Sequence, residues 1–376
     1  MRFVMKVGVP KEIKNNEFRV GMVPASVQEV VHSGHEVIVE TLAGSGIGYT
    51  DADYEAVGAS IRNTAEEIFA EAEMIVKVKE PQANERAMLR EDQILFTYLH
   101  LAPDMPQTED LVKSKAVCIA YETVTSPFGG LPLLAPMSEV AGRMSIQAGA
   151  QCLERSHAGR GMLLGGVPGV APAKVTIIGG GVVGSSAAQM AVGMGADVAI
   201  LDRNVDVLRK LNVQFGSSVK TIFSTKEALD QHVLNADLVI GGVLIPGAEA
   251  PKLVTREMIS KMKPGAALVD VAIDQGGCFE TSKPTTHAEP TYIIDEVVHY
   301  CVANMPGAVP RTSTFALNNV TLPYILQLAN KGYRQALADD KHLLEGLNVY
   351  QGKVTCEHVA ENLGFDYVSA KEALGL

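Results

Sequence analysis

Three basic side chains in the first hundred residues have the chemistry to bind a carboxylic acid and to move a proton. Arg19 can hold a carboxylate through two parallel hydrogen bonds, Lys79 can bind or polarise a carbonyl or carboxylate oxygen, and His100 can exchange a proton near neutral pH. Each of them follows an apolar run that predicts a β-strand. In open α/β sheets, ligands collect at the carboxyl ends of strands, so groups distant in sequence converge there. The three residues are therefore candidates for one binding site.

Each of these side chains also has a plainer interpretation. An arginine in a polar loop is usually a solvated charge, and Lys77 lies on the same face of its predicted strand as Lys79. His100 is flanked by leucines and could equally be a hydrogen-bonded histidine of the core. Three further histidines lack such a context and are expected to face solvent: His32, His35 and His157.

The apolar run 175–178 leads into a turn with glycines at Gly179, Gly181 and Gly184, followed by the helix-compatible stretch 185–191. In this context the first glycine permits a tight turn, the second lets the backbone approach a pyrophosphate, and the third allows the helix to pack closely on the strand. The N–H groups at the start of the helix, with about half a positive charge, would hold the phosphates. The glycine spacing alone is weak evidence, but strand, turn and helix in this order predict a dinucleotide-binding fold.

The residue that ends the next apolar run, 198–201, indicates which dinucleotide is expected. Asp202 lies where an acidic side chain can accept hydrogen bonds from both hydroxyls of the adenosine ribose. Arg203 follows it and could in principle accept the 2′-phosphate of NADP. Because the carboxylate of Asp202 would repel that phosphate, the sequence favours NAD.

Two further carboxylates lie where the apolar run 268–271 leaves the predicted sheet. Asp270 could be a structural cap that accepts backbone hydrogen bonds, since an unpaired buried carboxylate is costly. Asp274 precedes two glycines and is better placed to face a nicotinamide. The loops 243–247 and 304–306 follow predicted strands and could line the cleft that binds this nicotinamide.

Strand-like and helix-like patterns alternate along the chain, which predicts βαβ units and parallel sheets. In the first part, strands are expected at 6–9, 36–40, 74–78, 94–98 and 116–120, and helices at 26–33 and 64–70. A helix within 138–159 bridges to a second part, whose near-continuous apolar runs suit strands covered on both faces. These runs are 175–178, 198–201, 238–241 and 268–271. The helix expected at 315–339 has no place in the second sheet and is predicted to pack on the N-terminal domain.

Composition and charge narrow the class of protein. The 376 residues suffice for about two domains, and 20% charged with 47% hydrophobic residues is typical of an ordinary enzyme. The formal net charge of −11 argues against nucleic acid or an anionic membrane as a partner. Five scattered cysteines without a CxxC pair suggest free thiols and no metal site. Without a signal peptide or an apolar run of about 18 residues, the expected location is cytoplasmic.

Longer segments resemble the family of alanine dehydrogenases and transhydrogenase alpha subunits, and in particular its alanine dehydrogenases. The match covers essentially the whole chain and depends on long, specific strings, which are far rarer by chance than a glycine fingerprint. The strings are 15–20 (NNEFRV), 76–81 (VKVKEP), 133–142 (LLAPMSEVAG), 165–170 (GGVPGV), 274–278 (DQGGC) and 300–306 (YCVANMP).

The resemblance implies an α/β fold of two doubly wound parallel-sheet (Rossmann-like) domains, separated by a cleft and joined by two helices. Residues 1–134 and 308–376 would form a discontinuous substrate domain, and residues 135–307 the NAD-binding domain. The implied reaction is reversible oxidative deamination, in which L-alanine, NAD⁺ and water give pyruvate, ammonium and NADH. The implied assembly is a homohexamer.

The same resemblance implies a role for individual residues. Arg19 and Lys79 would bind the carboxylate and oxygen of the substrate. His100 would be the acid/base, and Asp274 the essential acid in the cleft. The implied cofactor-binding residues are Ser138, Gly179, Gly181, Val182, Val183, Gly184, Asp202, Arg203, Ser224, Val243, Leu244, Ile273, Asp274, Asn304 and Met305.

Three other functions compete with this expectation. A related enzyme could act on another substrate, as a saccharopine dehydrogenase-like lysine-forming enzyme or a reductase of glyoxylate or a similar 2-oxo acid. The chain could instead be the NAD-binding module of a proton-translocating transhydrogenase, which would need separate membrane and NADP-binding subunits. It could also be an NAD-sensing regulator without turnover, which the joint presence of Arg19, Lys79, His100 and Asp274 disfavours.

Overall fold

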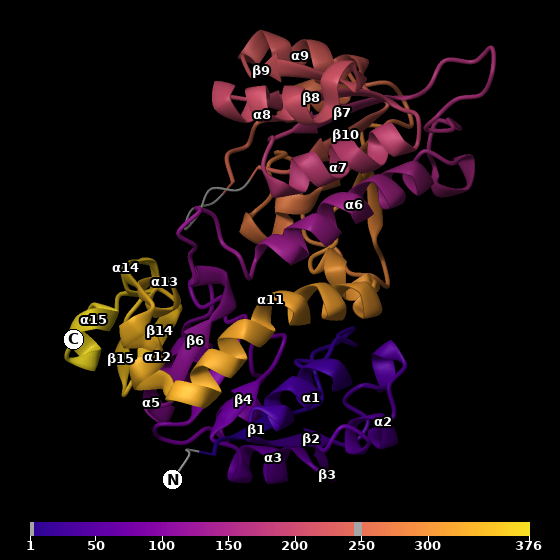
Figure 1. The fold of residues 1–376 in the computed structure, drawn as a ribbon. Helices are drawn as coiled ribbons and strands as arrows, with labels where there is room; N and C mark the ends of the chain where they lie inside the picture. The colour runs from indigo at the N-terminus through magenta and orange to yellow at the C-terminus, as the bar shows by residue number, and fades with distance from the viewer. Residues whose placement is uncertain (1–3, 244–249) are drawn as a thin grey trace. The chain divides into compact units, whose positions relative to one another are not determined.

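The computed structural model describes residues 4–243 and 250–376, and the chain in it divides into two compact units (Figure 1). Unit 1 comprises Met1–Pro136 and Val309–Leu376, and unit 2 comprises Met137–Ala308. Each unit is built around its own β-sheet with flanking helices. Unit 1 is therefore discontinuous in the sequence, with all of unit 2 inserted into it.

The sheet of unit 1 has eight strands in the order β15-β14-β6-β5-β4-β1-β2-β3. The strands from β6 to β3 are parallel, whereas β14 and β15 are antiparallel to their neighbours. The bounds are β1 (Lys6–Val9), β2 (Glu36–Glu40), β3 (Ser60–Arg62), β4 (Met74–Val76), β5 (Ile94–Thr97), β6 (Val117–Ala120), β14 (Leu347–Tyr350) and β15 (Lys353–Val354).

Several helices of unit 1 begin at polar caps or at proline. Thr50 and Thr64 each form a capping box with the acidic residue three positions later, and proline occupies the first turn of α1, α5 and α11. The bounds are α1 (Pro24–His32), α2 (Asp51–Glu55), α3 (Ala65–Glu71), α4 (Ala83–Arg86), α5 (Met105–Ser114), α11 (Pro310–Lys331), α12 (Tyr333–Asp339), α13 (Lys341–Leu344), α14 (Glu357–Leu363) and α15 (Ala370–Leu374).

The C-terminal segment returns to unit 1 through a helix and a strand. Helix α11 packs against α1, and β14 pairs with β6. The single helix expected at 315–339 is instead two helices, because Gly332 interrupts it with a φ of +71°. A residue in that left-handed conformation cannot continue an α-helix, and glycine adopts it at no steric cost.

The sheet of unit 2 has seven strands in the order β12-β13-β11-β10-β7-β8-β9, all parallel except β12. The strand bounds are β7 (Lys174–Ile178), β8 (Asp197–Asp202), β9 (Val219–Phe223), β10 (Leu238–Gly241), β11 (Ala267–Asp270), β12 (Thr291–Ile294) and β13 (Val297–Tyr300). The helix bounds are α6 (Ala135–Cys152), α7 (Val182–Gly193), α8 (Val205–Phe215), α9 (Lys226–Asn235) and α10 (Arg256–Ser260).

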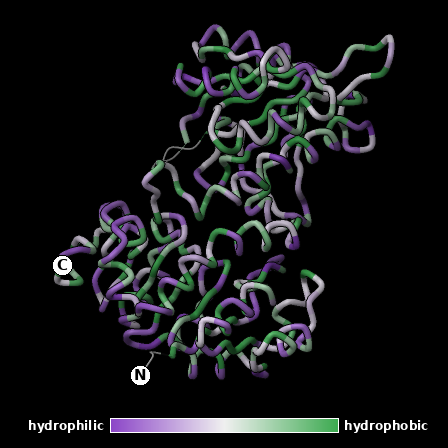
Figure 2. The backbone as a smooth tube through the Cα atoms, in the orientation of Figure 1, coloured by the Kyte–Doolittle hydropathy of each residue, from purple (hydrophilic) through white to green (hydrophobic). Residues whose placement is uncertain are grey.

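Successive strand residues of unit 2 belong to two different hydrophobic cores. Ile177 and Ile200 lie in one core, whereas their neighbours Ile178 and Leu201 lie in the other. Because strand side chains alternate between the two faces, both faces of this sheet are covered, and its inner strands are mostly apolar (Figure 2).

The parallel strands of the two units are arranged in the same way. Numbered along the chain within each unit, they follow the order 3-2-1-4-5-6, so the chain reverses its direction of progress between β1 and β4 in unit 1 and between β7 and β10 in unit 2. This is the doubly wound, Rossmann-like arrangement, and it confirms the expected fold class. The sheets are nevertheless mixed rather than purely parallel, because β12, β14 and β15 add antiparallel strands at the edges.

Candidate functional site

In unit 1 the candidate residues follow strands that lie side by side at the centre of the sheet. Arg19 lies in the connection after β1, Lys79 follows β4, and His100 follows β5. Because β1, β4 and β5 are parallel, their carboxyl ends meet at one edge of the sheet. Ligands of open α/β sheets bind at this edge, next to the point where the strand order reverses.

Arg19 is buried and fixed by a carboxylate two residues earlier. Its Nε and Nη2 donate to the two carboxylate oxygens of Glu17, each at 2.6 Å, and only 2% of the Arg19 surface is exposed. Two parallel hydrogen bonds of this kind hold the guanidinium in one orientation and offset its desolvation. The interpretation of Arg19 as a solvated loop charge is therefore wrong.

The structure distinguishes Lys77 from Lys79, which the sequence alone could not do. Lys77 is completely buried, and its Nζ forms ion pairs with Glu12 at 3.1 Å and Glu85 at 2.7 Å. Strand β4 ends at Val76, so the expected strand 74–78 is two residues too long, and the chain turns after these buried ion pairs. Lys79 lies nearer the surface, with Nζ 4.0 Å from Glu80 Oε2. Lys77 is thus part of the core, whereas Lys79 is partly exposed and remains the candidate of the two.

The main chain of Lys79 is fixed by side chains of two other segments. Glu12 Oε1 accepts hydrogen bonds from the N–H groups of Val78 at 2.7 Å and Lys79 at 3.3 Å. The hydroxyl of Thr97, at the end of β5, donates to the carbonyl oxygen of Lys79 at 2.9 Å. Burial alone would raise the pKa of Glu80, but Lys79 and Lys14 outweigh burial and lower it.

His100 is exposed, so the interpretation as a core histidine is wrong. Its backbone has a φ of +50°, and its imidazole stacks on the ring of Tyr98 with 5.8 Å between centroids and 13° between planes. Burial raises the pKa of Tyr98, so its hydroxyl remains protonated and donates to the carbonyl of Leu133 at 2.5 Å. The imidazole is therefore presented outward from a rigid aromatic support.

Of the three histidines expected to face solvent, His35 is the exception. Its Nδ1 accepts from the N–H of Met5 at 3.2 Å, its Nε2 lies 3.2 Å from Asn330 Oδ1, and it is buried. His32 and His157 are exposed as expected. The hydrogen bonds of His35 join the start of β1 to the end of α11, a long-range contact that local sequence does not indicate.

In unit 2 the glycine turn has the geometry that a pyrophosphate requires. Gly179 has a φ of +99°, in the left-handed region. A Cβ on Gly184 would lie 1.8 Å from the carbonyl oxygen of Gly179, whereas a Cβ on Gly181 would meet no atom within 4 Å. Gly181 is exposed and caps α7 without a side-chain hydrogen bond. Open space thus lies in front of the first turn of α7, where backbone N–H groups bind phosphate.

Asp202 ends β8 and contacts the same turn. Its Oδ2 accepts from the N–H of Gly180 at 2.7 Å, and its Oδ1 accepts from the N–H of Asn204 at 2.7 Å. These bonds hold the carboxylate beside the glycines, as expected for a residue that binds the ribose of a dinucleotide. Arg203 is exposed. The residues present therefore fit NAD.

The two carboxylates near the end of β11 differ in environment. Asp270 is completely buried and accepts hydrogen bonds from the N–H groups of Ala272 and Cys278 and from the hydroxyl of Ser282. Burial raises the pKa of Asp270, although these hydrogen bonds oppose the increase. It is a structural cap, one of the two possibilities left open by the sequence. Asp274 lies on a short 3-10 helix after it and is exposed.

The remaining expected cofactor residues lie mainly in the connections after strands of unit 2. The N–H of Ser224, after β9, donates to the carbonyl of Asp202 at 3.0 Å, and Val243 follows β10 next to Gly179. Asn304 has a φ of +62° and precedes the buried Met305. Ser138 lies near the start of α6, while Val182, Val183 and Ile273 belong to α7 and the 3-10 helix. Leu244 lies outside the described residues.

Sequence reasoning missed the acidic partners of the unit 1 candidates. Glu12, Glu17 and Glu122 each bind a candidate residue or its main chain. Glu17 could have been suspected, because it lies two residues before Arg19. Glu12 and Glu122 could not, because they come from connections after other strands, and only the strand order brings them close.

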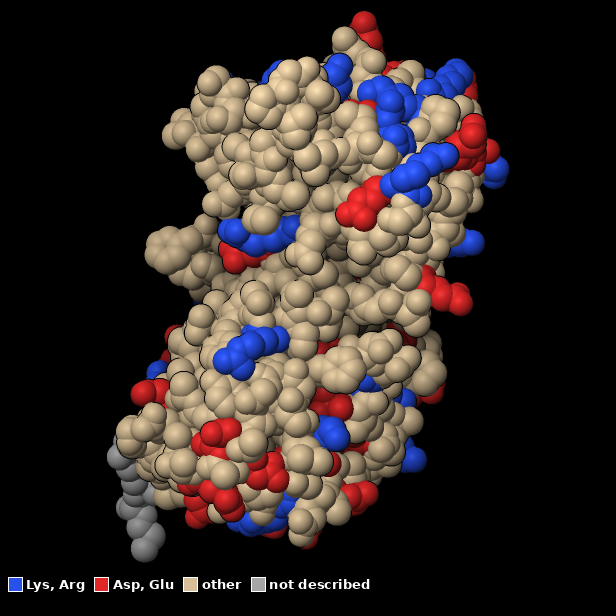
Figure 3. All heavy atoms as spheres, turned by 90° about the vertical axis from the view of Figure 1, so that its right-hand side faces the viewer, with Lys and Arg blue, Asp and Glu red and all other residues tan. Residues whose placement is uncertain are grey.

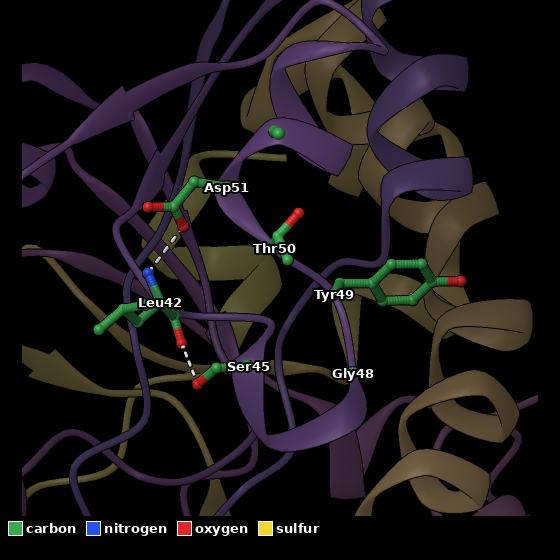
Figure 4. A pocket seen from close by; sticks show the side chains of 7 residues that line it. Leu42, Ser45, Gly48, Tyr49, Thr50 and Asp51 are labelled. Carbon is green, nitrogen blue, oxygen red and sulfur yellow. Dashed lines mark hydrogen bonds between the residues drawn. The ribbon is translucent and has the colours of Figure 1, made fainter.

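A separate hollow of about 500 Å³ in unit 1 is lined by residues of one loop (Figure 4). The loop satisfies its own polar groups there: Asp51 accepts from the N–H of Leu42, and Ser45 donates to the carbonyl of Leu42. Asp51 and Ser45 are therefore already engaged in hydrogen bonds within this segment.

Residues 4–243 and 250–376 contain no group of three or more histidine, cysteine, aspartate or glutamate side chains that could hold a metal ion. Over the same residues, no helix combines the length and apolar character needed to cross a membrane. On the face drawn in Figure 3, lysine and arginine side chains are interspersed with aspartate and glutamate and form no continuous basic surface.

The chain is similar to known proteins over almost its whole length. The family models described as "Alanine dehydrogenase/PNT, N-terminal domain" and "Alanine dehydrogenase/PNT, C-terminal domain" match residues 8–141 and 145–357. The alanine dehydrogenase of Halomonas elongata is 60% identical over 371 residues, covering 99% of this chain and 100% of that protein. That of Mycolicibacterium smegmatis is 55% identical over 370 residues, covering 98% and 100%.

Solved structures are also similar to this chain over almost its whole length. An L-alanine dehydrogenase structure superposes with a TM-score of 0.93 at 52% identity, covering 96% of this chain and 99% of that one. A transhydrogenase from Sinorhizobium meliloti superposes with a TM-score of 0.79 at 24% identity, covering 94% and 99%. At that lower identity the likeness is one of fold.

The environments of Lys77 and Lys79 predict that the same substitution mainly affects stability at Lys77 and substrate binding at Lys79. Lys77→Met would leave the carboxylates of Glu12 and Glu85 buried without their cation and lower the free energy of unfolding by about 3–5 kcal/mol. Lys79→Met should lower stability less, because Lys79 is only partly buried and Glu80 keeps Lys14 as a partner, and it should raise the KM for a 2-oxo acid substrate. Denaturant unfolding and steady-state kinetics of both variants test this, and the reverse pattern would reassign the ligand-binding lysine.

The glycine turn provides a second matched pair. Gly184→Ala should disrupt folding, because its Cβ would overlap the carbonyl oxygen of Gly179. Gly181→Ala should fold normally, because its φ of −71° suits any residue and its Cβ meets open space. The methyl group would, however, occupy the path of the pyrophosphate and weaken NADH binding about tenfold or more. Thermal unfolding and NADH fluorescence titration measure the two effects, and unchanged affinity in Gly181→Ala would place the phosphates elsewhere.

Proposed function

The chain belongs to the alanine dehydrogenase/PNT family, and from this premise we propose that it catalyses the reversible oxidative deamination of L-alanine to pyruvate and ammonium with NAD. The observation that carries the proposal is 60% identity to an alanine dehydrogenase over the full length of both chains. The grouping of Arg19, Lys79 and His100 at one sheet edge supports it, because a small 2-oxo acid offers a carboxylate, a carbonyl oxygen and a site for protonation.

Substrate binding is assigned to Arg19 and Lys79. The guanidinium of Arg19, oriented by Glu17, would bind the carboxylate, and Lys79 Nζ would bind the carboxylate or carbonyl oxygen. Two cations would hold the substrate so that its Cα–H bond has one orientation, and such positioning can lower a barrier by several kcal/mol, on the order of 7 or more when alignment is good.

Proton transfer is assigned to His100. The chemistry that bound NAD supplies is acceptance of the hydride from Cα in one direction and its donation in the other. As water adds to the resulting substrate iminium, His100 takes up a proton, and it returns one as the carbinolamine expels ammonia. Asp274, exposed beyond β11, would offset the positive charge of the amine and iminium.

The choice of NAD over NADP is supported by the position of Asp202. Its carboxylate is held beside the glycine turn by two backbone hydrogen bonds, so it cannot readily withdraw from a 2′-phosphate. The exposed Arg203 does not remove this repulsion, because the carboxylate remains fixed at the ribose position.

A homohexamer in the cytoplasm is part of the same proposal. The family resemblance supports the hexamer. The five cysteines support the location, because all of them carry free thiols, as in a reducing compartment. Apolar side chains that are more than half exposed, such as Phe128 and Leu163, are also compatible with burial against further copies.

A spectrophotometric assay of the purified chain tests the proposed reaction. NADH should be consumed only when pyruvate and ammonium are both present, and NADPH should replace it poorly. Glyoxylate, and 2-oxoglutarate with lysine, serve as competing substrates. Faster turnover with 2-oxoglutarate and lysine would favour a lysine-forming enzyme, and NADH binding without turnover would favour a regulator or a transhydrogenase module.

His100→Ala should lower kcat by about 10²-fold or more, because proton transfer contributes that much in comparable sites. The side chain is exposed, so the substitution should not affect folding. His32→Ala, an exposed histidine of the same unit, is the matched control and should retain full activity. A nearly normal rate for His100→Ala would remove the histidine from the mechanism.

A further inference from the structure

The backbone of His100 adopts a conformation that must be imposed by its surroundings. Its φ of +50° lies in the left-handed region, which is unfavourable for an L-residue with a full side chain. Neither neighbour, Leu99 or Leu101, is a glycine that would ease the turn. The contacts that hold this conformation also determine where the imidazole points.

One contact comes from Glu122, in the segment that follows β6. Its Oε1 accepts from the N–H of His100 at 2.5 Å and from the N–H of Leu99 at 3.0 Å, and its Oε2 lies 3.2 Å from the latter. A carboxylate that accepts two adjacent backbone N–H groups fixes the orientation of both peptide planes.

The opposing contact comes from Gln107, on α5. Its side chain is completely buried, and Nε2 donates to the carbonyl oxygen of Leu99 at 2.5 Å. Its Oε1 has no hydrogen-bond partner among the described residues. An unpaired buried acceptor is destabilising, so methionine or leucine would suit packing alone better. The contribution of the glutamine must therefore come from its N–H donor.

These contacts hold the peptide group between Leu99 and His100 at both of its polar ends. Gln107 binds its C=O and Glu122 binds its N–H, from two different elements of unit 1. Fixing this plane constrains the rotation about the N–Cα bond of His100 from one side, and stacking on Tyr98 restricts the ring. We infer that Gln107 and Glu122 are positioning residues that aim the imidazole of His100, an inference that depends on the proposed role of His100 in proton transfer.

The substitution Gln107→Met tests the inference, with Gln93→Met as its matched control. Gln93 is also buried in unit 1, and its Nε2 donates to the carbonyls of Phe69 and Ala72. It precedes β5, whereas His100 follows the opposite end of that strand. Gln107→Met should lower kcat about tenfold or more while the KM for pyruvate stays unchanged, because small misplacements of a reacting group are costly. Gln93→Met should retain kcat.

Hydrogen exchange of the Leu99 and His100 amides gives a readout that does not require activity. It should accelerate in Gln107→Met and remain unchanged in Gln93→Met. Equal losses of kcat in the two variants, or unchanged exchange with normal kcat in Gln107→Met, would overturn the inference. A wild-type chain without ammonium-dependent turnover would overturn the proposed function alone, since the exchange result would stand.

Two substitutions of Glu122 keep the test decisive if Gln107→Met does not fold. Glu122→Gln retains a carbonyl oxygen that can accept from the His100 N–H, whereas Glu122→Leu retains no acceptor. The expected order of both kcat and exchange protection is wild type, then Glu122→Gln, then Glu122→Leu. If Glu122→Leu kept the wild-type kcat, the inference would be wrong.

Discussion

The order of the parallel strands determines where both candidate sites lie. In each unit the connections leave the sheet in opposite directions from one central pair, β1 and β4 or β7 and β10. Loops on the two sides of such a pair diverge, which is where open α/β sheets bind ligands. The substrate candidates follow the first pair and its neighbour β5, and the glycine turn follows the second. One topological rule, applied twice, thus provides a place for a small acid and a place for a dinucleotide.

Acidic side chains hold the basic residues or their main chain in place in unit 1. Glu17 orients Arg19, Glu12 fixes the main chain of Lys79, and Glu122 does the same for His100. A buried cation is costly unless a carboxylate and further hydrogen bonds accompany it. Glu17 therefore makes it possible to bury the Arg19 guanidinium beside a candidate binding site and holds it in one orientation, whereas Glu12 and Glu122 fix the backbone from which Lys79 and His100 extend. This arrangement suits an enzyme that must align a three-atom carbon chain.

Local sequence was sufficient for most inner strands and for the glycine turn, but it missed the buried inner strands β13 and β14 and the strands at the edges of the sheets. The runs at β7, β8, β10 and β11 were located to within one residue, because strands covered on both faces are continuously apolar. The strands β3 and β9 were not expected, because they are short or half exposed and lack such runs. The burial of Arg19, Lys77 and His35 was also not predictable, because it depends on partners such as Glu85 and Asn330 that only the tertiary fold supplies.

The insertion of one unit into the other has a consequence for synthesis on the ribosome. Unit 2 is one continuous segment of the chain, so its sheet can form during translation as soon as that segment has left the ribosome. Unit 1 cannot, because β6 must wait for β14, which is translated only after the whole of unit 2. Until then the partly made protein exposes an unpaired strand edge, a surface that chaperones bind and that promotes aggregation. The lobe proposed to bind the substrate would thus be the last to mature.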